Sequence, residues 1–74
     1  MLVTLYSTAR CVQCDATKKA LDNQGIEYQL IDLNDDPSAK EKVAELGYRQ
    51  LPVVVAGAHH WAGFRPDMIR QLVA

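Results

Sequence analysis

The sequence predicts an α/β protein in which one mixed four-stranded sheet is flanked by three helices. Three observations support this prediction. Short runs of strand-forming apolar residues alternate with helix-favouring stretches, in the order βαβαββα. Gly25 and Gly47 stand where the first two helices should end, since a glycine just after the last turn stops a helix. The 74 residues are enough for one small domain, which we expect to span 1–74.

The first half of the chain predicts a parallel strand-helix-strand unit. A first strand is expected at residues 2–6 (LVTLY), followed by a turn and then a helix at about 12–24. A second strand is expected at 27–32, where polar and apolar residues alternate and place Tyr28 and Leu30 on one face. The connection between two such parallel strands crosses right-handedly, which is the start of a layered α/β fold.

The second helix should begin at Asp36 and Pro37. Aspartate is a favoured N-cap, and proline suits the first helical position because the N–H that it lacks would be unpaired there. Three apolar residues then keep the helical spacing i, i+4 and i+7, namely Ala39, Val43 and Leu46.

The remainder of the chain predicts a hairpin and a closing helix. Strands are expected at 51–56 and at about 59–61, joined by a tight turn at Gly57 and Ala58. The final helix should begin near 65–67. Its apolar side is formed by Ile69, Leu72 and Val73.

Composition excludes several classes of function. The net charge of −1 and the 23% of charged residues give no electrostatic reason to expect nucleic acid or an anionic membrane as the main partner. No apolar run approaches the roughly 18 residues of a membrane-spanning helix. The first residues form a strand without a basic n-region, so we expect no secretory signal and a cytoplasmic protein. A mature chain whose signal had been removed would begin in the same way.

The only two cysteines, Cys11 and Cys14, stand in the stretch TARCVQCDATKK, where a strand gives way to a helix. Free backbone N–H groups and the positive end of the helix dipole stabilise a thiolate at such a position. Cys11, beside the cationic Arg10 and better exposed, should be the nucleophile. Cys14, one turn into the helix, should be the resolving thiol that breaks a mixed disulfide. The pair therefore predicts a redox-active disulfide.

The residues alone also admit two alternatives to a redox pair. The cysteines could be small core residues, because buried cysteine often serves as a hydrophobe. They could also supply half of a zinc site, with His59 and His60 as the other ligands. Adjacent residues on a strand point to opposite faces, so both histidines cannot easily converge on one ion. The position after a strand and before a helix favours the redox interpretation.

Pro52 admits two interpretations from the residues alone. It can be a proline that opens a strand, where it need not donate to the sheet ladder. It can also follow a cis peptide bond that exposes the backbone of Leu51 for pairing with a substrate strand. Trp61 and Phe64 are each expected in the core by default, and Gly63 gives the backbone freedom for a turn between them.

Three stretches of the chain closely resemble the NrdH-redoxins, and the opening strand that ends at Tyr6 agrees with them as well. The stretches are CVQCDATKKAL (11–21), GYRQLPVVV (47–55) and HWAGFRPDMI (60–69). The resemblance covers essentially the whole chain and implies a thioredoxin/glutaredoxin-like fold. Ala62 stands where the family more often has serine, and residues 8–10 match less closely. Both departures touch the rim of the site and leave the chemistry of the cysteines intact.

The resemblance also implies a function. Members of that family look like glutaredoxins in sequence yet behave like thioredoxins. They take electrons from NADPH through thioredoxin reductase and pass them to class Ib ribonucleotide reductase, the enzyme that makes deoxyribonucleotides. We therefore expect a thiol-disulfide oxidoreductase that acts as an electron-transfer protein, whose partners are the reductase and the large subunit of ribonucleotide reductase. We further expect a monomer with no bound cofactor and no metal.

Residue roles follow from the resemblance by position. Cys11 is the nucleophile, Cys14 the resolving thiol and Pro52 the cis-proline. Residues 61–67 would form a turn that packs beside the thiols and closes the wide glutathione cleft. The residues expected to bind substrate are Leu51, Pro52, Trp61, Ala62, Gly63, Phe64 and Arg65.

True glutaredoxins differ at the positions that bind glutathione. They carry a lysine shortly before the first cysteine, a threonine-valine pair before the cis-proline and a Gly-Gly pair followed by an acidic residue or a threonine. The corresponding positions in this chain look like Thr8, Gln50-Leu51 and residues 62–65, where Phe64 and Arg65 replace small polar residues. We therefore expect glutathione to bind poorly.

Overall fold

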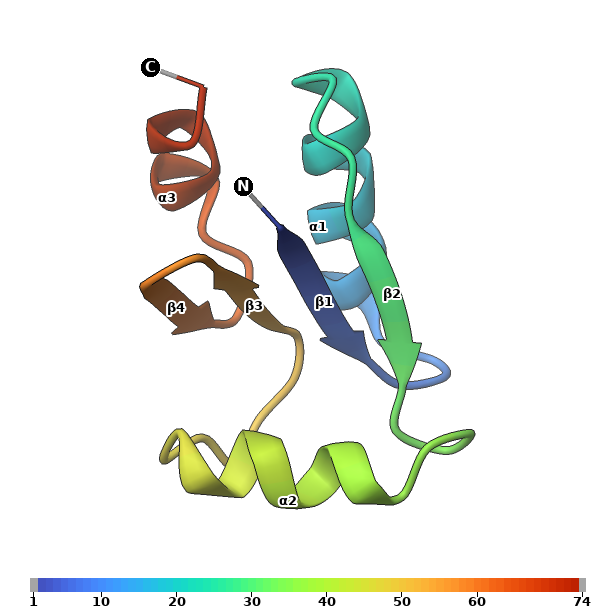
Figure 1. The fold of residues 1–74 in the computed structure, drawn as a ribbon. Coiled ribbons are helices and arrows are strands. Elements are labelled where there is room, and N and C mark those ends of the chain that lie inside the picture. The colour runs from blue at the N-terminus through green and yellow to red at the C-terminus, as the bar shows by residue number, and fades with distance from the viewer. Residues whose placement is uncertain (1, 74) are drawn as a thin grey trace.

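The computed structural model describes residues 2–73, and within them four strands and three helices follow one another in the predicted order βαβαββα (Figure 1). The strands are β1 (Val3–Ser7), β2 (Gln29–Asp32), β3 (Val53–Ala56) and β4 (His59–Ala62). The helices are α1 (Val12–Asn23), α2 (Ser38–Glu45) and α3 (Pro66–Gln71). The predicted fold class, a mixed four-stranded sheet with three helices, is confirmed.

The strands form one sheet in the order β2-β1-β3-β4. β1 and β2 run parallel, with Leu5 opposite Leu30, whereas β1 and β3 run antiparallel, with Leu5 opposite Val54. β3 and β4 form the predicted hairpin, with Val54 opposite Trp61. β1 is therefore an inner strand, and its C-terminal end leads into the turn that precedes the cysteines.

The two faces of the sheet bury two separate apolar clusters, because successive residues of a strand point to opposite faces. Leu5 of β1 belongs to the cluster that includes Leu21 of α1 and Ile69 of α3. Tyr6, its neighbour, belongs to the cluster that includes Val43 of α2. α1 and α3 thus cover one face, and α2 lies on the other face across one end of the strands (Figure 1).

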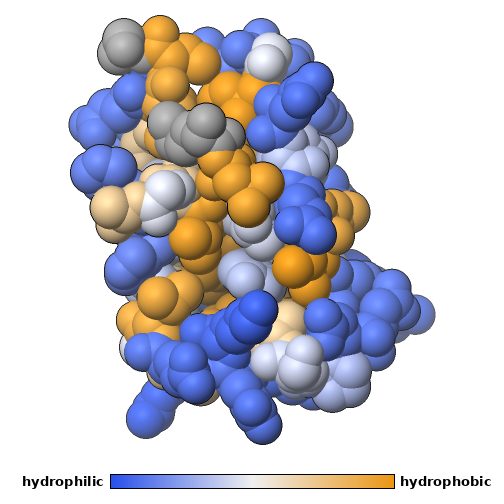
Figure 2. Space-filling model, viewed as in Figure 1, coloured by the Kyte–Doolittle hydropathy of each residue, from blue (hydrophilic) through white to orange (hydrophobic). Residues whose placement is uncertain are grey.

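The hydropathy of the surface differs between the region around α2 and the region over the strands. In Figure 2 hydrophilic residues dominate the lower part of the molecule around α2, and hydrophobic residues gather in its middle and upper part, over the strands. Leu30 on the edge strand β2 is 48% exposed, although its partner across the ladder, Leu5, is fully buried. Among residues 2–73 there is no helix with the length and apolar character needed to cross a bilayer.

Element boundaries differ from the predictions by one to two residues in most cases. β2 begins at Gln29 because its pairing with β1 starts opposite Thr4, and Tyr28 lies before the strand and packs against the first cluster. The expectation that the second strand begins at residue 27 and includes Tyr28 is therefore wrong. β3 begins at Val53, which is the last residue paired with β1, so residues 51 and 52 precede the strand.

The start of α2 is also shifted. The regular helix begins at Ser38, and Pro37 takes the N-cap position in place of the expected N1. Asp36 still acts at this end, because its carboxylate accepts the backbone N–H of Ser38 at 3.2 Å and the Ser38 hydroxyl at 2.6 Å. The aspartate thus supplies the capping interaction that the sequence predicts, one residue before the assigned N-cap.

Candidate active site

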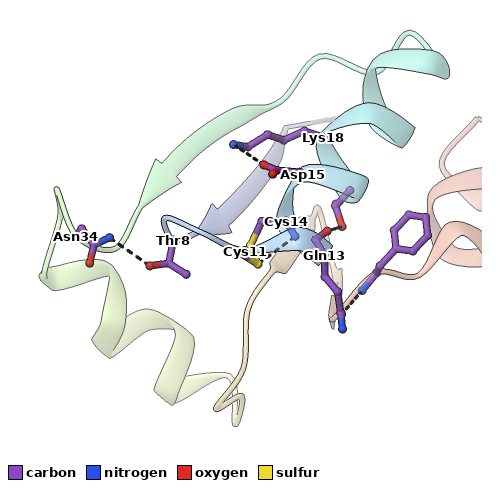
Figure 3. Close-up of a disulfide and its surroundings, with 9 residues drawn as sticks. Thr8, Cys11, Gln13, Cys14, Asp15, Lys18 and Asn34 are labelled. Carbon is purple, nitrogen blue, oxygen red and sulfur yellow. Dashed lines mark hydrogen bonds and ion pairs between the residues drawn. A yellow bond between two sulfur atoms is a disulfide. The ribbon is translucent and has the colours of Figure 1, made fainter.

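Cys11 and Cys14 form a disulfide at the start of α1, with their Cα atoms 5.1 Å apart (Figure 3). This separation lies within the ordinary range for a disulfide. Both cysteines of the chain are therefore joined to each other. The structure describes the oxidised state of the pair.

Local backbone geometry places Cys11 at the helix end. Cys11 is the N-cap of α1, with extended φ and ψ of −111° and 105°. Its Sγ accepts a hydrogen bond from the backbone N–H of Cys14 at 3.0 Å, and its carbonyl accepts the N–H of Asp15 at 3.1 Å. A sulfur at this position receives a backbone donor and the positive end of the helix dipole, and both interactions favour a thiolate after reduction.

The two sulfur-bearing residues differ in their exposure. Cys14 is 1% exposed, whereas Cys11 is only partly buried. Val12 and Gln13 between them are exposed, so the surface beside Cys11 is open to a partner. A protein disulfide can therefore approach Cys11 and cannot reach Cys14 without displacing the surrounding chain.

Arg10 immediately precedes the pair and adopts a left-handed backbone conformation, with φ of 57°. A residue with a Cβ atom pays about 1–2 kcal/mol for this conformation relative to a right-handed one. This conformation turns the chain from β1 into α1. The Arg10 side chain, which directly precedes Cys11 in the sequence, is exposed.

The segment before β3 forms a second part of the site. The peptide bond between Leu51 and Pro52 is cis. Pro52 is buried and Leu51 is partly exposed. The carbonyl of Pro52 accepts a hydrogen bond from the N–H of Gly63 at 2.8 Å, which joins this segment to the turn after β4.

The turn between β4 and α3, residues 63–65, forms the third part. Gly63 has a φ of 83°, a left-handed conformation that favours glycine. The N–H of Phe64 donates to Oε1 of Gln13 at 3.2 Å, and the Phe64 side chain is 39% exposed. These contacts bring the cysteine helix, the Leu51–Pro52 segment and the β4–α3 turn into one assembly.

Arg65 makes a two-pronged ion pair with Asp67 in the first turn of α3. Its Nε lies 3.1 Å from Oδ1, and its Nη2 lies 2.9 Å from Oδ2. Because Arg65 donates these hydrogen bonds, the pKa of the Asp67 carboxyl lies below its ordinary value, and the same bonds raise the pKa of Arg65. The cation of Arg65 is thus already partnered within the chain.

Two of the expected substrate-binding residues belong to β4 and not to the turn. Trp61 is 4% exposed and packs in the first apolar cluster, and its Nε1 has no hydrogen-bond partner among the described residues. Ala62 is partly buried against the second cluster. Both residues therefore anchor the start of the turn, whereas Gly63, Phe64 and Arg65 form the part that faces outward or contacts Gln13.

The remaining residues singled out in the sequence lie at or beyond the rim. The hydroxyl of Thr8 accepts a hydrogen bond from Nδ2 of Asn34 at 3.2 Å (Figure 3). His59 and His60 are neighbours on β4, and Nδ1 of His60 lies 2.7 Å from the hydroxyl of Tyr48. Within residues 2–73 no group of three or more His, Cys, Asp and Glu side chains is placed to hold a metal ion.

Two surface hollows lie away from the disulfide. One, of about 340 Å³, is bordered by Leu2, Val3 and residues 27–29, next to the start of β1. The other, of about 190 Å³, lies between β4 and α3 and is lined by Trp61 and Met68 among others. Neither hollow is lined by a cysteine.

Gln13 is the site residue that sequence reasoning missed. In the sequence it is an uncharged residue between the two cysteines. Its side-chain oxygen reaches a residue 51 positions away, and its backbone carbonyl accepts the hydroxyl of the buried Thr17 at 2.8 Å. A long amide on the exposed first turn of the helix was the available signal.

Comparisons with known proteins agree with this geometry. The model of the glutaredoxin family matches residues 3–61. The glutaredoxin-like protein NrdH of Escherichia coli K12 is 49% identical over 72 residues, which cover 97% of this chain and 89% of that protein. The protein of the same description from Lactococcus lactis subsp. cremoris is 37% identical over 71 residues, covering 96% of this chain and 99% of the relative.

Solved structures give the same result. The structure of NrdH-redoxin from Escherichia coli, described as a glutaredoxin-like protein with a thioredoxin-like activity profile, superposes with a TM-score of 0.94 at 49% identity. The match covers 97% of this chain and 95% of that one. A buckwheat glutaredoxin in complex with glutathione superposes with a TM-score of 0.75 at 25% identity, covering 96% of this chain and 68% of that one.

Proposed function

Since the chain belongs to the glutaredoxin family and, within it, to the NrdH-redoxins, we propose that it carries electrons from NADPH-dependent thioredoxin reductase to class Ib ribonucleotide reductase. That it is a glutaredoxin-like thiol redox protein with a Cys-x-x-Cys disulfide follows from the family and from the bond between Cys11 and Cys14. The identity of the donor and acceptor is the proposal. The acceptor would be the large subunit of the ribonucleotide reductase.

The observation that carries the proposal is the unequal exposure of the two cysteines at a helix start. In the reduced protein the Cys11 thiolate attacks one sulfur of the substrate disulfide, and the other substrate sulfur leaves as a thiolate that takes up a proton. Cys14 then loses its proton and attacks Sγ of Cys11, releasing the second substrate thiolate. Two electrons have passed to the substrate, and the carrier ends as the disulfide seen here.

The carrier must then be reduced again. We propose that a thiolate of thioredoxin reductase attacks Cys11, because its sulfur is the accessible one, and that Cys14 leaves as a thiolate that takes up a proton. A second reductase thiolate then attacks the reductase sulfur of the mixed disulfide and releases Cys11 as a thiolate, and NADPH supplies the two electrons to the reductase. The chain itself then needs no bound cofactor, since all of its redox chemistry takes place at the two sulfurs.

Glutathione is the alternative donor, and the match to the glutaredoxin family keeps it a second candidate. Three features of the chain support the reductase instead. Thr8 offers no cation to a glutathione carboxylate, and its hydroxyl is bonded to Asn34. Phe64 adds bulk at the β4–α3 turn, and the Arg65 guanidinium is paired with Asp67.

One assay separates the two donors. The oxidised protein is incubated either with NADPH and thioredoxin reductase or with reduced glutathione, and the appearance of free thiols is followed. We expect efficient reduction by the reductase and slow reduction by glutathione. Efficient turnover with glutathione and none with the reductase would overturn the proposal. Reconstitution of deoxyribonucleotide formation with a class Ib ribonucleotide reductase then tests the acceptor.

We place this reaction in the cytoplasm and propose that the protein acts as a monomer. The support for the compartment is cysteine usage, because thiols in the cytosol are kept reduced and a pair at this spacing is typical of catalytic chemistry there. Fractionation of cells that express the chain tests its location. Size-exclusion chromatography with light scattering tests the oligomeric state.

A further inference from the structure

Gln13 occupies an unusual position for a residue between two reactive cysteines. It lies exposed on the first turn of α1, and its side chain extends away from the disulfide (Figure 3). A side chain of the same helix holds its backbone, because the hydroxyl of the fully buried Thr17 donates to the Gln13 carbonyl at 2.8 Å. The side-chain amide of Gln13 is therefore attached to a helical residue whose backbone is hydrogen-bonded, and not to a flexible loop.

The oxygen of that amide takes up a backbone donor of the β4–α3 turn. Oε1 of Gln13 accepts the N–H of Phe64 at 3.2 Å. The preceding N–H of the turn, that of Gly63, donates to the carbonyl of Pro52 at 2.8 Å. Two consecutive N–H groups beside the disulfide are thus satisfied inside the protein.

A backbone N–H that is free can bind a carboxylate, and such a charge-assisted hydrogen bond is stronger than a neutral one. Glutathione is a thiol with two carboxylates. Here the oxygen of Gln13 already fills the place that a carboxylate oxygen would take at Phe64. The nearby cation cannot compensate without breaking its own bond, because Arg65 is held by Asp67.

The fit around Gln13 is close. A Cβ atom placed on Gly63 would lie 3.4 Å from Oε1 of Gln13, so the amide lies against the backbone of the turn. A ligand that sought the Phe64 N–H would first have to move the Gln13 side chain.

We propose that Gln13 is a specificity-determining positioning residue whose amide oxygen occupies the turn N–H of Phe64 and thereby excludes glutathione from the cysteine pair. This inference deepens the proposed function and rests on it for its biological meaning. The reaction that Gln13 hinders is reduction of the disulfide by two glutathione molecules. The first thiolate attacks Cys11 and releases Cys14, and the second attacks the glutathione sulfur, leaving the protein dithiol and glutathione disulfide.

The test compares Gln13→Leu, which keeps the bulk and removes the acceptor, with Gln13→Glu, which keeps an acceptor oxygen. Gln29→Leu is the matched control, because Gln29 is an exposed glutamine on β2 that borders the hollow near the start of β1. Two quantities are measured: the hydrogen-exchange rate of the Phe64 amide by NMR, and the rate of disulfide reduction by reduced glutathione divided by that by dithiothreitol. The ratio removes any change in the intrinsic reactivity of the disulfide.

In Gln13→Leu we expect the Phe64 amide to exchange roughly three- to tenfold faster, the factor that the loss of one typical hydrogen bond gives, and the glutathione ratio to rise by a similar factor. In Gln13→Glu the Phe64 amide should exchange as in the unsubstituted protein, and Gln29→Leu should change neither quantity. An unchanged exchange rate in Gln13→Leu, or faster exchange with an unchanged glutathione ratio, would overturn the inference. Failure of the proposed function appears separately, as unsubstituted protein that thioredoxin reductase does not reduce.

Discussion

The backbone N–H of Cys14 donates a hydrogen bond to Sγ of Cys11 at 3.0 Å, so the amide of the buried cysteine stabilises the sulfur of the exposed one. The same contact identifies Cys11 as the N-cap of α1. The Sγ atom of Cys11 therefore both caps the helix and carries the redox chemistry. The different roles of the two cysteines, one as nucleophile and one as resolving thiol, are thus linked to the helix capping by Cys11.

The first prediction concerns that division of labour. Cys14→Ser should accumulate a mixed disulfide between Cys11 and an oxidised protein substrate, because the thiol that resolves it is missing. Cys11→Ser should trap none, since Cys14 is 1% exposed and cannot reach a partner. Non-reducing electrophoresis with mass spectrometry of the linked peptides measures both outcomes. Trapping through Cys14 in place of Cys11 would refute the assignment, and the double variant Cys11→Ser/Cys14→Ser is the control for non-covalent association.

The second prediction compares two leucines that face each other across the β1–β2 ladder. Leu5 is fully buried and Leu30 is 48% exposed. Leu5→Ala should lower the free energy of unfolding by about 2–5 kcal/mol, because it leaves a cavity in the core. Leu30→Ala should lower it by well under half of that, since less apolar surface is removed from contact. Denaturant titration of both variants checks this, and equal losses would contradict the difference in burial between the two leucines.

The third prediction concerns the left-handed backbone at Arg10. Arg10→Gly should raise the free energy of unfolding by about 1 kcal/mol, because glycine adopts a φ of 57° without the steric cost of a Cβ atom. Arg10→Ala removes the same charge and keeps the Cβ atom, so it should bring no such gain. Chemical denaturation of the oxidised proteins measures both values. If alanine stabilised as much as glycine, charge and not backbone conformation would be the cause.

The fourth prediction concerns the pH dependence of the Arg65–Asp67 pair. The hydrogen bonds from Arg65 lower the pKa of Asp67 below its ordinary value in the folded protein. The pair therefore stabilises the fold fully above the ordinary carboxyl pKa of about 3.9, and its contribution is lost as the pH falls through the lower, folded-state pKa.

An NMR titration of the Asp67 carboxyl carbon measures this shift. Arg65→Gln should raise the pKa of Asp67 toward its ordinary value, whereas Arg49→Gln, at an exposed arginine that does not contribute to the shift, should leave it unchanged. An Asp67 carboxyl that titrates at its ordinary value in the unsubstituted protein would contradict the two-pronged pair.

The order and type of the elements could be predicted from sequence because they depend on local patterns. The apolar runs, the glycines after α1 and α2 and the aspartate before α2 each act over a few residues. The start of β2 was harder to place, because it depends on pairing with Thr4 of another strand and not on the residues near Glu27. The exposure of Leu30 likewise follows from the position of β2 at the edge of the sheet. The alternation of polar and apolar residues does not show whether a strand is at the edge or in the middle.

The site divides in the same way. The cysteine pair and its placement at a helix start are local, so their chemistry could be inferred from spacing. The contact between Gln13 and Phe64 joins residues 51 positions apart, and a long amide on the first turn of a helix does not by itself indicate which partner it will contact. Arg10 gave no signal for its left-handed conformation, since glycine is the residue that usually marks such a position.

Trp61 is the only tryptophan in the chain, and it is buried in the same apolar cluster as Leu21 of the cysteine-bearing helix. An indole in apolar surroundings emits at shorter wavelength than one in water, and the tryptophan emission of this protein comes from a single site in its core. Loosening of α1 or α3 would be visible in the emission spectrum without any label. The chain thus contains its own optical probe, linked through one packed cluster to the helix on which electrons are exchanged.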